Sequence, residues 1–317
     1  MNLQPLVTVN ILSFNRKNEL RNTLTKVYEQ DYKNIEVIVV DNASSDGTSE
    51  MVESNFPQVI LFKLGQNIGI SGYNLGFEHA KGEFILVLDD DSYPLESTIH
   101  VAVLEFQKEI NLGIIACKII NTRFNKIETE SYLEYPISFI GCGAFFRKEY
   151  LVNIGYYNNL YFIYFNELEL TARFYNKGYL VKYIPTCIAI HIQNINSRGT
   201  KNQNPFTSEY RFRHSFWGGA VFLLQNFYLK YSFLYLSKLV LNRFIIAVKY
   251  CYFKSFVKSL FKIFSNLYKI IRSRKVLNEE VQKLYRFGNL FALVDRDYFP
   301  SFSKPKYSSI FKLFRSD

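Results

Sequence analysis

Apolar runs alternate with amphipathic stretches along the first 90 residues. Four runs rich in Val, Ile, Leu and Phe are typical of strands buried on both faces: residues 6–12, 35–40, 59–62 and 84–88. Three stretches between them have the spacing of helices: residues 18–30, 48–54 and 74–80. This alternation predicts an α/β domain with a mostly parallel sheet that helices cover on both faces.

Polar residues follow each predicted strand at the edge where α/β sheets bind their ligands. Ser13, Asn15 and Arg16 come after the first strand and Asp41 after the second. A segment rich in Asn and Gly, residues 67–76, follows the third strand. The pattern therefore predicts one ligand site at the carboxyl ends of these strands.

Three consecutive acids, Asp89, Asp90 and Asp91, end the fourth predicted strand. Alternate carboxylates at that position converge on one point, and their oxygen atoms suit Mg²⁺ or Mn²⁺. The alternative is that Asp91 or Ser92 caps a helix that begins at Pro94. A cap explains one acid and leaves the other two unexplained.

Further along, two acids, Glu167 and Glu169, begin a helical stretch that ends near Gly178. A strand, a turn at Pro185 and a second apolar run follow, and that run ends at His191. By spacing alone, a histidine after an apolar run is more often a surface or core residue than a metal ligand.

Charge divides the chain into two parts. Residues 1–204 carry 18 Lys and Arg against 22 Asp and Glu, whereas residues 205–317 carry 20 against 6. The polar stretch 197–205 is expected to be a mobile loop or linker. We therefore expect a first domain over residues 1–204 and a helical C-terminal region over 205–317.

Residues 253–272 have the pattern of one amphipathic helix. The apolar face would carry Phe253, Phe256, Val257, Leu260, Phe261, Phe264, Leu267, Tyr268 and Ile271, and the other face Lys254, Lys258, Lys262 and Lys269. Upstream, charges interrupt the apolar stretch 221–253, so a helix lying on an anionic membrane fits better than a spanning one. The alternative is that the apolar face packs on the first domain or in a homo-oligomer. Nucleic acid is not an expected partner, because no recognised binding motif is present.

The four cysteines show no CxxC spacing, and the first residues have neither a charged segment nor an apolar segment of a secretory signal. We therefore expect a cytoplasmic, reduced protein without a structural zinc, placed on the inner face of the plasma membrane by its C-terminal helices.

Five ordered motifs together resemble glycosyltransferase family 2: VTVNILSFNRKNEL, VIVVDNASSDGT, GQNIGISGYNLGFEHAKGEFILVLDDDSYP, GCGAFFRKEYL and YFNELELTARFYNKGYLVKYIPTCIAIH. They cover residues 5 to 195, and they most resemble the motifs of the branch that contains rhamnosyltransferases and galactofuranosyltransferases. The resemblance implies a GT-A fold, which is Rossmann-like, and a nucleotide-activated sugar as donor.

The resemblance assigns a donor site to four of the segments that follow strands. Asp41 would accept a hydrogen bond from the imide N–H of uracil or thymine, which implies a UDP- or dTDP-sugar, with Ser13, Asn15 and Arg16 lining the same pocket. The glycine-rich turn would approach diphosphate or ribose with Asn67, Gly69, Gly72, Asn74 and Gly76. Tyr73 stands where many members of the family have arginine. The alternative is that Asp41 and Asp46 only cap the next helix.

For the chemistry, the resemblance implies a metal held in a DXD-type motif and a catalytic base. Asp89 and Asp91 would be metal ligands, His191 a third ligand, and Asp90 would face ribose or sugar hydroxyls. Glu167 would be the base that deprotonates the acceptor hydroxyl, with Glu169 as its competitor. The family usually has an acidic pair with Asp second, and this chain has Asn166 and Glu167.

These expectations describe an inverting, metal-dependent glycosyltransferase that acts on a glycan or a lipid-linked glycan in bacterial cell-surface polysaccharide synthesis. Two alternatives stay open. One is a scaffold that binds a sugar nucleotide or glycan without catalysis, and the other is a nucleotidyltransferase that would release pyrophosphate.

Overall fold

The structure is a computed structural model that describes residues 4–130, 132–192 and 208–287. The chain divides into two compact units, residues 1–159 with 177–198, and residues 160–176 with 199–317. The expected linker 197–205 and the boundary at residue 204 lie outside the described residues. Helix α6 (Asn166–Asn176), which carries Glu167, groups with the C-terminal helices in the second unit.

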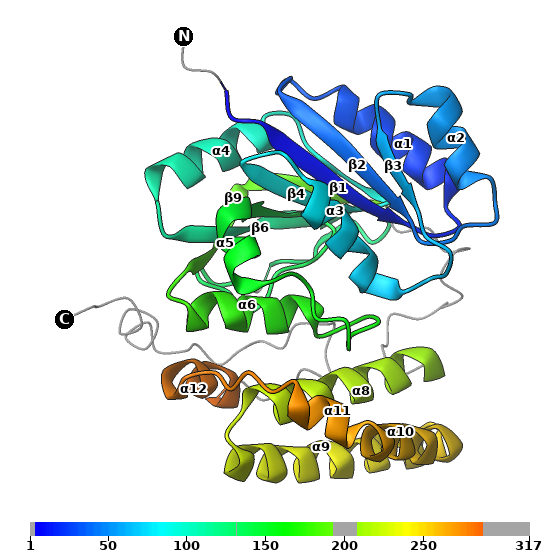
Figure 1. Cartoon of the computed structure of the whole chain (residues 1–317), viewed down its shortest axis with the longest axis vertical. Helices are drawn as coiled ribbons and strands as arrows, with labels where there is room; N and C mark the ends of the chain where they lie inside the picture. Colours follow the sequence, from blue (N-terminus) through cyan, green and yellow to red (C-terminus); the bar gives the residue numbers. More distant parts are fainter. Residues whose placement is uncertain (1–3, 131, 193–207, 288–317) are drawn as a thin grey trace. The chain divides into compact units, whose positions relative to one another are not determined.

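The described part of the first unit contains one nine-stranded mixed sheet in the order β3-β2-β1-β4-β8-β6-β9-β5, with β7 beside β6 (Figure 1). Its strands are β1 (Val7–Ser13), β2 (Ile35–Asp41), β3 (Ile60–Lys63), β4 (Phe84–Asp89), β5 (Ser92–Pro94), β6 (Leu112–Asn121), β7 (Lys126–Ile127), β8 (Ala144–Arg147) and β9 (Leu180–His191). The first four strands are parallel, as predicted, whereas β8, β5 and β7 pair antiparallel with their neighbours.

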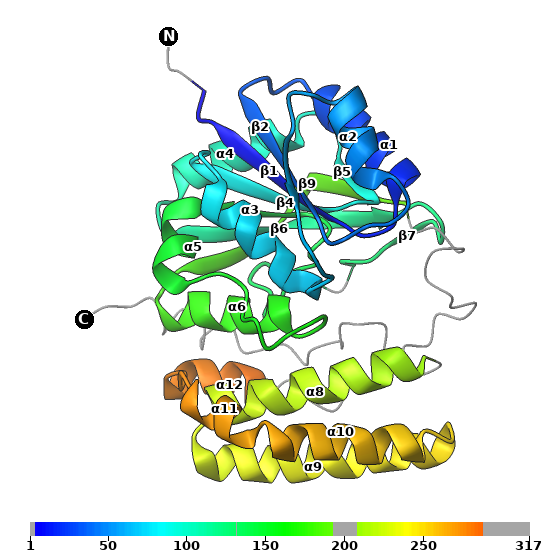
Figure 2. The ribbon, with the colours of Figure 1, turned by 45° about the vertical axis from the view of Figure 1, so that its right-hand side comes forward.

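Helices cover both faces of this sheet. On one face, α1 (Lys17–Tyr28), α2 (Thr48–Asn55) and α4 (Thr98–Lys108) bury apolar side chains against alternate residues of β1, β2 and β4. On the other face, α3 (Tyr73–His79) follows the 3-10 turn η1 (Gly69–Gly72) and crosses the strands, and α5 (Lys148–Ile154) follows β8 (Figures 1 and 2). The parallel strands therefore end at one edge, where the loops of interest meet.

Two local expectations in this unit were wrong. The predicted turn at Pro185 is absent, because β9 is one strand whose register against β6 jumps from Ile184 to Ile188. A proline has no N–H for the ladder, and the irregularity accommodates it. The predicted alternative of a helix beginning at Pro94 is also wrong, since residues 92–94 form strand β5 and α4 begins at Thr98.

The second unit is helical. Helices α8 (Glu209–Asn226), α9 (Leu229–Lys249) and α10 (Phe253–Ser265) run side by side, followed by α11 (Leu267–Arg272) and α12 (Glu279–Phe287) (Figure 2). The single helix predicted over residues 253–272 is wrong, because it breaks at Asn266. The Asn266 side chain donates to the carbonyl of Lys262 at 2.9 Å and caps the end of α10.

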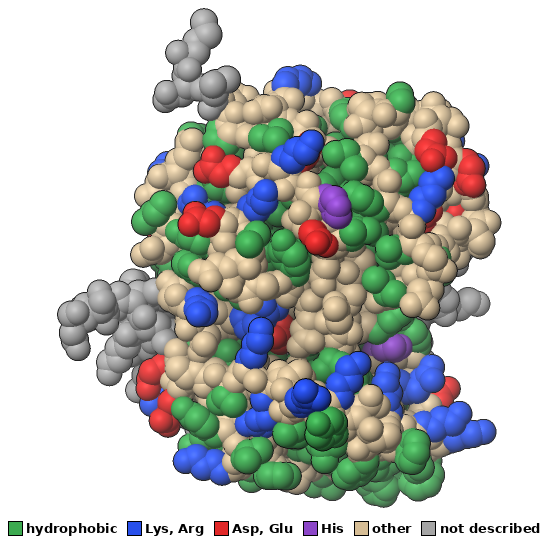
Figure 3. Space-filling view, viewed as in Figure 1, with side chains coloured by type: hydrophobic (Ala, Val, Ile, Leu, Met, Phe, Trp, Pro, Cys, Tyr) green, Lys and Arg blue, Asp and Glu red, His purple; other side chains and the backbone are tan. Residues whose placement is uncertain are grey.

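The apolar face of α10 is divided between the interior and the surface. Phe256 and Ile263 are buried with two serines, Ser255 and Ser259, whereas the phenylalanines Phe253, Phe261 and Phe264 are exposed. Figure 3 shows hydrophobic side chains next to Lys and Arg over the helices of this unit. The helix therefore packs through a narrow stripe and leaves much of its apolar surface uncovered.

Candidate functional site

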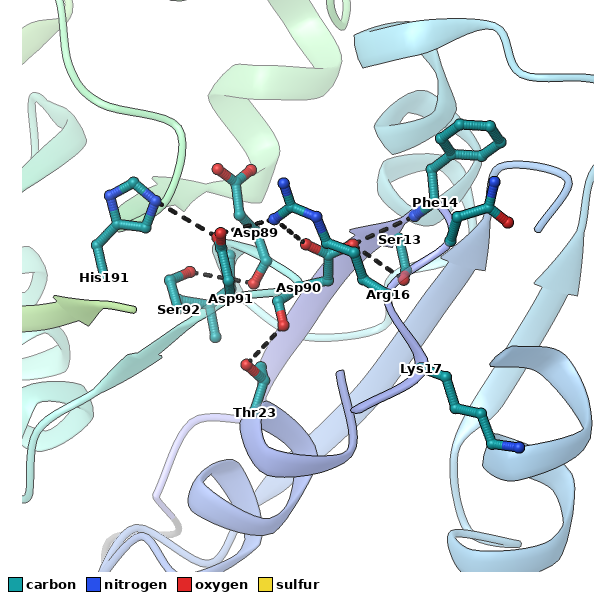
Figure 4. Close-up of polar contacts among 12 residues, drawn as sticks. Ser13, Phe14, Arg16, Lys17, Thr23, Asp89, Asp90, Asp91, Ser92 and His191 are labelled. Atoms are coloured by element: carbon teal, nitrogen blue, oxygen red, sulfur yellow. Dashed lines mark hydrogen bonds and ion pairs between the residues drawn. The ribbon is translucent and has the colours of Figure 1, made fainter. Parts of the chain in front are cut away.

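The acid triplet and His191 meet because of one strand pairing. After β4, the chain turns through Asp90 and Asp91 into β5, and Ser92 of β5 lies opposite His191 at the end of β9. The backbone N–H of Ile192 also donates to the carbonyl of Asp91 at 2.8 Å. As a result, side chains about 100 residues apart in sequence gather at one edge of the sheet (Figure 4).

His191 lies between two carboxylates. Its Nε2 is 3.4 Å from Asp91 Oδ1, and its Nδ1 is 3.3 Å from Glu128 Oε1. Burial would lower the pKa of His191, but hydrogen bonds and charge from Asp91 and Glu128 raise it to about 10. Glu128 also accepts from Asn121 at 2.5 Å, and its pKa is lowered by His191 and Asn121 in spite of burial.

The donor set at this position fits a divalent ion. Two ligand atoms that share an ion at ~2.1 Å lie roughly 3.0 to 3.4 Å apart for the usual coordination angles. The distance of 3.4 Å between His191 Nε2 and Asp91 Oδ1 lies at the upper end of this range. One ligand atom each of Asp89, His191 and Cys142 also lies within 4.8 Å of the others. Carboxylates and imidazole suit Mn²⁺, while a thiolate from Cys142 would favour Zn²⁺.

Arg16 supplies the positive charge at the triplet in this structure. Its guanidinium Nη1 is 2.6 Å from Asp91 Oδ2 and 3.0 Å from Asp90 Oδ1 (Figure 4). Burial would lower the pKa of Arg16, but the charges of Asp90, Asp91 and Asp89 raise it above its usual value. The resemblance implied that Arg16 lines the donor pocket. Its ion pairs with the acids of the triplet were not expected.

Asp90 holds the loop that follows β1. Its carboxylate accepts from the Ser13 hydroxyl at 3.0 Å and from the backbone N–H of Phe14 at 3.2 Å, while its carbonyl accepts from Thr23 at 2.9 Å. Burial raises the pKa of Asp90 to about 7, against the opposing effect of Arg16. These contacts give Asp90 a structural role that the expectation of a ribose or sugar contact had not included.

Asp89 is held from the other side by Tyr73. The buried Tyr73 hydroxyl lies 2.7 Å from the carbonyl of Leu88 and 3.0 Å from Asp89 Oδ1. Burial raises the pKa of Tyr73 well above its usual value, so this group stays a neutral donor. At the position where many members of the family have arginine, Tyr73 therefore orients the Asp89 carboxylate through a hydrogen bond.

Asp41 is buried in the turn between β2 and α2. Its two carboxylate oxygens accept from the backbone N–H of Ser44 at 2.9 Å and from the hydroxyl of Ser49. Asn15 of the neighbouring loop has a positive φ of 52° and binds the same turn through Ser44 and Ser45. An ionised carboxylate has about four acceptor positions, so Asp41 retains capacity for a ligand N–H.

Asp46 lies one residue before Gly47, which is the N-cap of α2. Its carboxylate accepts from the backbone N–H of Thr48 at 3.1 Å and from that of Lys17 at 3.0 Å. These bonds hold the turn before α2 and join it to α1, so Asp46 has a structural role, although it is not the N-cap that the alternative expected.

The glycine-rich turn has two kinds of glycine. Gly69 has a φ of 64°, which favours glycine, and its N–H donates to Asn67. Gly72 and Gly76 lie against β1, where an added Cβ would meet Leu12 at 2.4 Å and Asn10 at 2.0 Å. These two positions therefore have a packing reason for glycine.

The side-chain hydrogen bonds of Asn74 go to the segment after α5. Its amide binds the backbone of Tyr157 in both directions, at 2.8 and 3.0 Å, and thereby fastens α3 to the segment after α5.

In the second unit, the two acids of α6 differ in their surroundings. Glu169 is buried, and both of its oxygens pair with Arg173, at 2.8 and 2.9 Å. Glu167, two residues earlier, is half-buried, and residues Tyr164 and Phe165 before this helix have φ values of 68° and 65°. Two successive left-handed non-glycine residues are costly and are typical of functional segments.

Sequence reasoning missed Glu128, Cys142 and the role of Tyr73. Glu128 follows β7, the second strand of the β6–β7 hairpin. This hairpin places Glu128 beside the last residues of β6 and β9. In the sequence, Glu128 lies in a polar stretch and belongs to no recognisable motif. Its position beside His191 becomes visible only from the pairing of strands that are distant in sequence.

The fold and this site define the class of the protein: a GT-A glycosyltransferase domain with a helical C-terminal region. The family model for glycosyl transferase family 2 matches residues 8–167, about half of the chain. The chain therefore belongs to glycosyltransferase family 2. The particular branch proposed from the motifs is not distinguished by this match.

Curated relatives share the N-terminal part. The glycosyltransferase GlyA of Streptococcus pneumoniae serotype 4 is 30% identical over 113 residues, 34% of this chain and 16% of that protein. The probable glycosyltransferase YdaM of Bacillus subtilis is 27% identical over 58% of this chain and 50% of that protein. The poly-beta-1,6-N-acetyl-D-glucosamine synthase of Staphylococcus aureus is 24% identical over 56% of this chain and 48% of that protein. The chain thus spans half or less of the length of these relatives.

Solved structures share the fold. The mannosyltransferase PcManGT from Pyrobaculum calidifontis, in complex with GDP-Man and Mn²⁺, superposes with a TM-score of 0.59 and 20% identity over 92% of this chain and 81% of that chain. TarS of S. aureus in complex with UDP superposes with a TM-score of 0.52 and 18% identity over 75% of this chain and 71% of that chain. At these identities the likeness shows the fold alone.

Proposed function

We propose that this protein is an inverting glycosyltransferase that uses a divalent metal and a UDP- or dTDP-sugar. The observation that carries the proposal is the convergence of Asp89, Asp91 and His191 at the carboxyl edge of the sheet, where the loop after β1 and the turn after β2 also end. This is the edge at which α/β sheets bind nucleotides.

Several residues of the first unit would together bind the donor. Asp41 accepts the imide N–H of the base, and Asn15 and Ser13 shape the pocket beside it. Asp89, Asp91 and His191 hold Mn²⁺ or Mg²⁺, which neutralises the charge that develops on the leaving nucleoside diphosphate. Arg16, freed from Asp91 when an ion binds, would have a guanidinium available for a phosphate oxygen.

Glu167 would act as the base that accepts the proton of the acceptor hydroxyl. Three observations support this choice over Glu169. The family match extends to residue 167, Glu169 is committed to Arg173, and a strained segment leads directly into Asn166 and Glu167. In addition, the amide of Asn166 is buried and has no hydrogen-bond partner among the described residues, which marks this short segment as unusual.

The acceptor would be a glycan on a lipid carrier, in cell-surface polysaccharide synthesis. The argument is the uncovered apolar surface of the second unit and its surplus of lysines, which fit an anionic membrane surface at the cytoplasmic face. Among the described helices, α9 alone is long and apolar enough to span a membrane, with a mean hydropathy of 1.3. The fully buried Arg243 on α9 favours packing of this helix within the unit over a span.

The test of the donor site is a thermal-shift panel of UDP, dTDP, GDP and CDP, each with Mn²⁺ or EDTA. We expect UDP or dTDP to stabilise the protein only with Mn²⁺, and the Asp91→Ala variant to lose that stabilisation. Lys63→Ala, which removes a surface ion pair with Glu53, is the matched control. Equal stabilisation of the Asp91→Ala variant would refute the metal-dependent donor site.

The test of catalysis is Glu167→Gln, which keeps size and removes the base. We expect sugar transfer to fall at least a hundredfold while donor affinity is unchanged. If the wild-type protein binds donor and transfers nothing to any glycan acceptor, the scaffold alternative takes its place. Release of pyrophosphate would instead identify a nucleotidyltransferase.

A further inference from the structure

A cluster of basic side chains and aromatic rings lies on α8, on α10 and on the segment before α6, all within the second unit. It consists of Arg213, His214 and Lys262 together with Trp217 and Phe162, and we name it the basic-aromatic cluster. The Lys262 ammonium lies 4.5 Å from the centre of the Trp217 ring. The His214 ring lies 5.2 Å from that of Phe162 and 4.3 Å from that of Tyr210.

No acidic side chain of the described residues forms an ion pair with the positive charges of Arg213 and Lys262. Arg213 and Lys262 are exposed, and within the described part of the chain neither has an ion-pair partner within 4.0 Å. Burial and then the charges of Lys262 and Arg213 lower the pKa of His214 to about 4. Burial and Arg213 likewise lower the pKa of Lys262. Basic groups that disfavour one another's protonation favour binding of an anion, and phosphate is the group that a guanidinium and an ammonium match together.

The cluster touches the segment that leads to Glu167. The indole N–H of Trp217 donates to the carbonyl of Leu160 at 2.6 Å, and Phe162 of the same segment stacks near His214. Glu167 lies five positions after Phe162 in sequence, and both residues belong to the second unit. An anion at the cluster would therefore lie beside the segment that carries the proposed base.

The apolar groups beside the cluster are the rings of Trp217 and Phe162, which contact Lys262 and His214. Other faces of α10 also expose apolar side chains, among them Phe261, which is 74% exposed, and Phe264, which is 68% exposed. A free inorganic anion needs no such surface, whereas a phosphate attached to a hydrocarbon chain has both a charge and an apolar tail to place.

We propose that Arg213, His214 and Lys262 bind the diphosphate of a lipid-linked glycan acceptor, with Trp217 and Phe162 as the apolar floor. This inference rests on the proposed function, because it names the residues that would hold the lipid-linked acceptor of the same transfer. The Arg213 guanidinium and the Lys262 ammonium contact the phosphate oxygens, and the imidazole of His214 donates a hydrogen bond to them.

The only tryptophan of the 317-residue chain is Trp217, so its fluorescence reports on this site alone. The experiment titrates the full chain in neutral detergent with farnesyl diphosphate, with farnesol and with inorganic pyrophosphate, and separately with phosphatidylglycerol vesicles. We expect a saturable change with farnesyl diphosphate, a response at least tenfold weaker to pyrophosphate, and none to farnesol. Vesicles without a prenyl diphosphate should not reproduce the change.

The variants separate this site from general charge. Lys262→Gln and Arg213→Gln should each weaken farnesyl diphosphate binding about tenfold or more, which is the usual loss for one charge-assisted hydrogen bond. Lys262→Arg should restore most of it. Lys249→Gln removes another lysine that lies over an aromatic ring, 5.4 Å from Tyr250, and should change nothing.

Several outcomes overturn the inference. No fluorescence change, an equal response to pyrophosphate or to anionic vesicles, or full binding by Lys262→Gln would each reject a lipid-diphosphate site. Donor binding in the thermal-shift panel is read independently. If the wild type binds the donor and Lys262→Gln leaves farnesyl diphosphate binding unchanged, only the inference fails. If the wild type does not bind any donor nucleotide, the proposed function is rejected.

Discussion

Glu128 determines which nitrogen of His191 is left for a ligand. Its carboxylate lies 3.3 Å from Nδ1 and is itself held by Asn121, the residue opposite His191 in the β6–β9 ladder. A carboxylate at Nδ1 fixes the ring and its tautomer, so Nε2 points toward Asp91. The metal proposal therefore depends on a residue that is not a ligand.

Replacing Glu128 should weaken metal binding. We expect Glu128→Ala to lower Mn²⁺ affinity 10- to 100-fold, the usual effect of losing such a partner, and Glu128→Gln to lower it less because an acceptor oxygen remains. Electron paramagnetic resonance of free Mn²⁺ measures the affinity. Glu134→Gln, which removes a longer contact of 3.9 Å with Lys182, is the control. Unchanged affinity in Glu128→Ala would show that the carboxylate does not orient the ligand.

His214 should make the protein less stable in acid. Its folded pKa of about 4 lies below the ordinary value of 6.5, because burial and the charges of Lys262 on α10 and Arg213 on α8 disfavour its proton. The unfolded chain therefore binds more protons between pH 6.5 and 4, and the stability that is present above pH 6.5 falls as the pH drops through this window. Urea unfolding of the wild type and of His214→Phe across this range should show a shallower slope for the variant. Parallel slopes would contradict the lowered pKa.

At the level of single residues, the sequence predicted the conspicuous acids and missed their partners. Asp89 and Asp91 were expected from the acid triplet that ends a buried strand, and His191 from the family resemblance. The β5–β9 pairing brings Asp91 and His191 together. The contact of Arg16 with two of the acids, and the role of Tyr73, depend on which rotamers fit a packed loop. No spacing rule encodes that information.

At the level of elements, strands were easier to predict than their irregularities. Runs of buried Val, Ile and Leu predicted the ends of the four parallel strands to within one residue. Such continuous apolar runs are typical of strands that helices cover on both faces. The bulge at Pro185 and the break at Asn266 were missed. At both positions the backbone can continue its element or interrupt it at similar energy. Contacts with neighbouring elements determine which of the two conformations forms.

The contact of α3 with β1 gives a test at this scale. Gly76→Ala should destabilise the protein by about 1 to 3 kcal/mol, because its Cβ would overlap the side chain of the buried Asn10. Gly65→Ala has no atom within 4 Å of the new Cβ and is the matched control. Denaturant unfolding measures both. If the two variants lose equal stability, the glycine at position 76 is not required for close packing.

At the level of the whole molecule, charge separates two compact units with different surfaces. No Asp or Glu occurs between Glu209 and Glu279, and this stretch includes α8 to α11. Composition alone predicted this asymmetry. It left open whether the apolar side chains of α10 are covered, and the exposed phenylalanines at positions 253, 261 and 264 show that they are uncovered within the described part of the chain.

Vesicle binding should therefore have two separable components. The full chain should float with vesicles that contain phosphatidylglycerol and bind neutral vesicles less. Lys254→Gln with Lys258→Gln should weaken flotation at low salt and matter little at high salt, because exposed charges are screened. Phe261→Ser with Phe264→Ser should weaken flotation about tenfold or more at every salt concentration, because apolar burial does not depend on screening.

The control for this pair lies in the first unit, where Leu104 and Ile110 are also exposed. Leu104→Ser with Ile110→Ser removes similar apolar area without touching the basic helices, so flotation should be unchanged. Sedimentation of the same proteins tests the competing occupant of the surface, a second copy of the chain. If the phenylalanine pair converts a dimer into a monomer and leaves flotation intact, the apolar surface of α10 is a subunit interface, and the membrane has to be contacted elsewhere. If flotation falls and the sedimentation is unchanged, the bilayer is the partner of this surface, which is where a lipid-linked acceptor would be found.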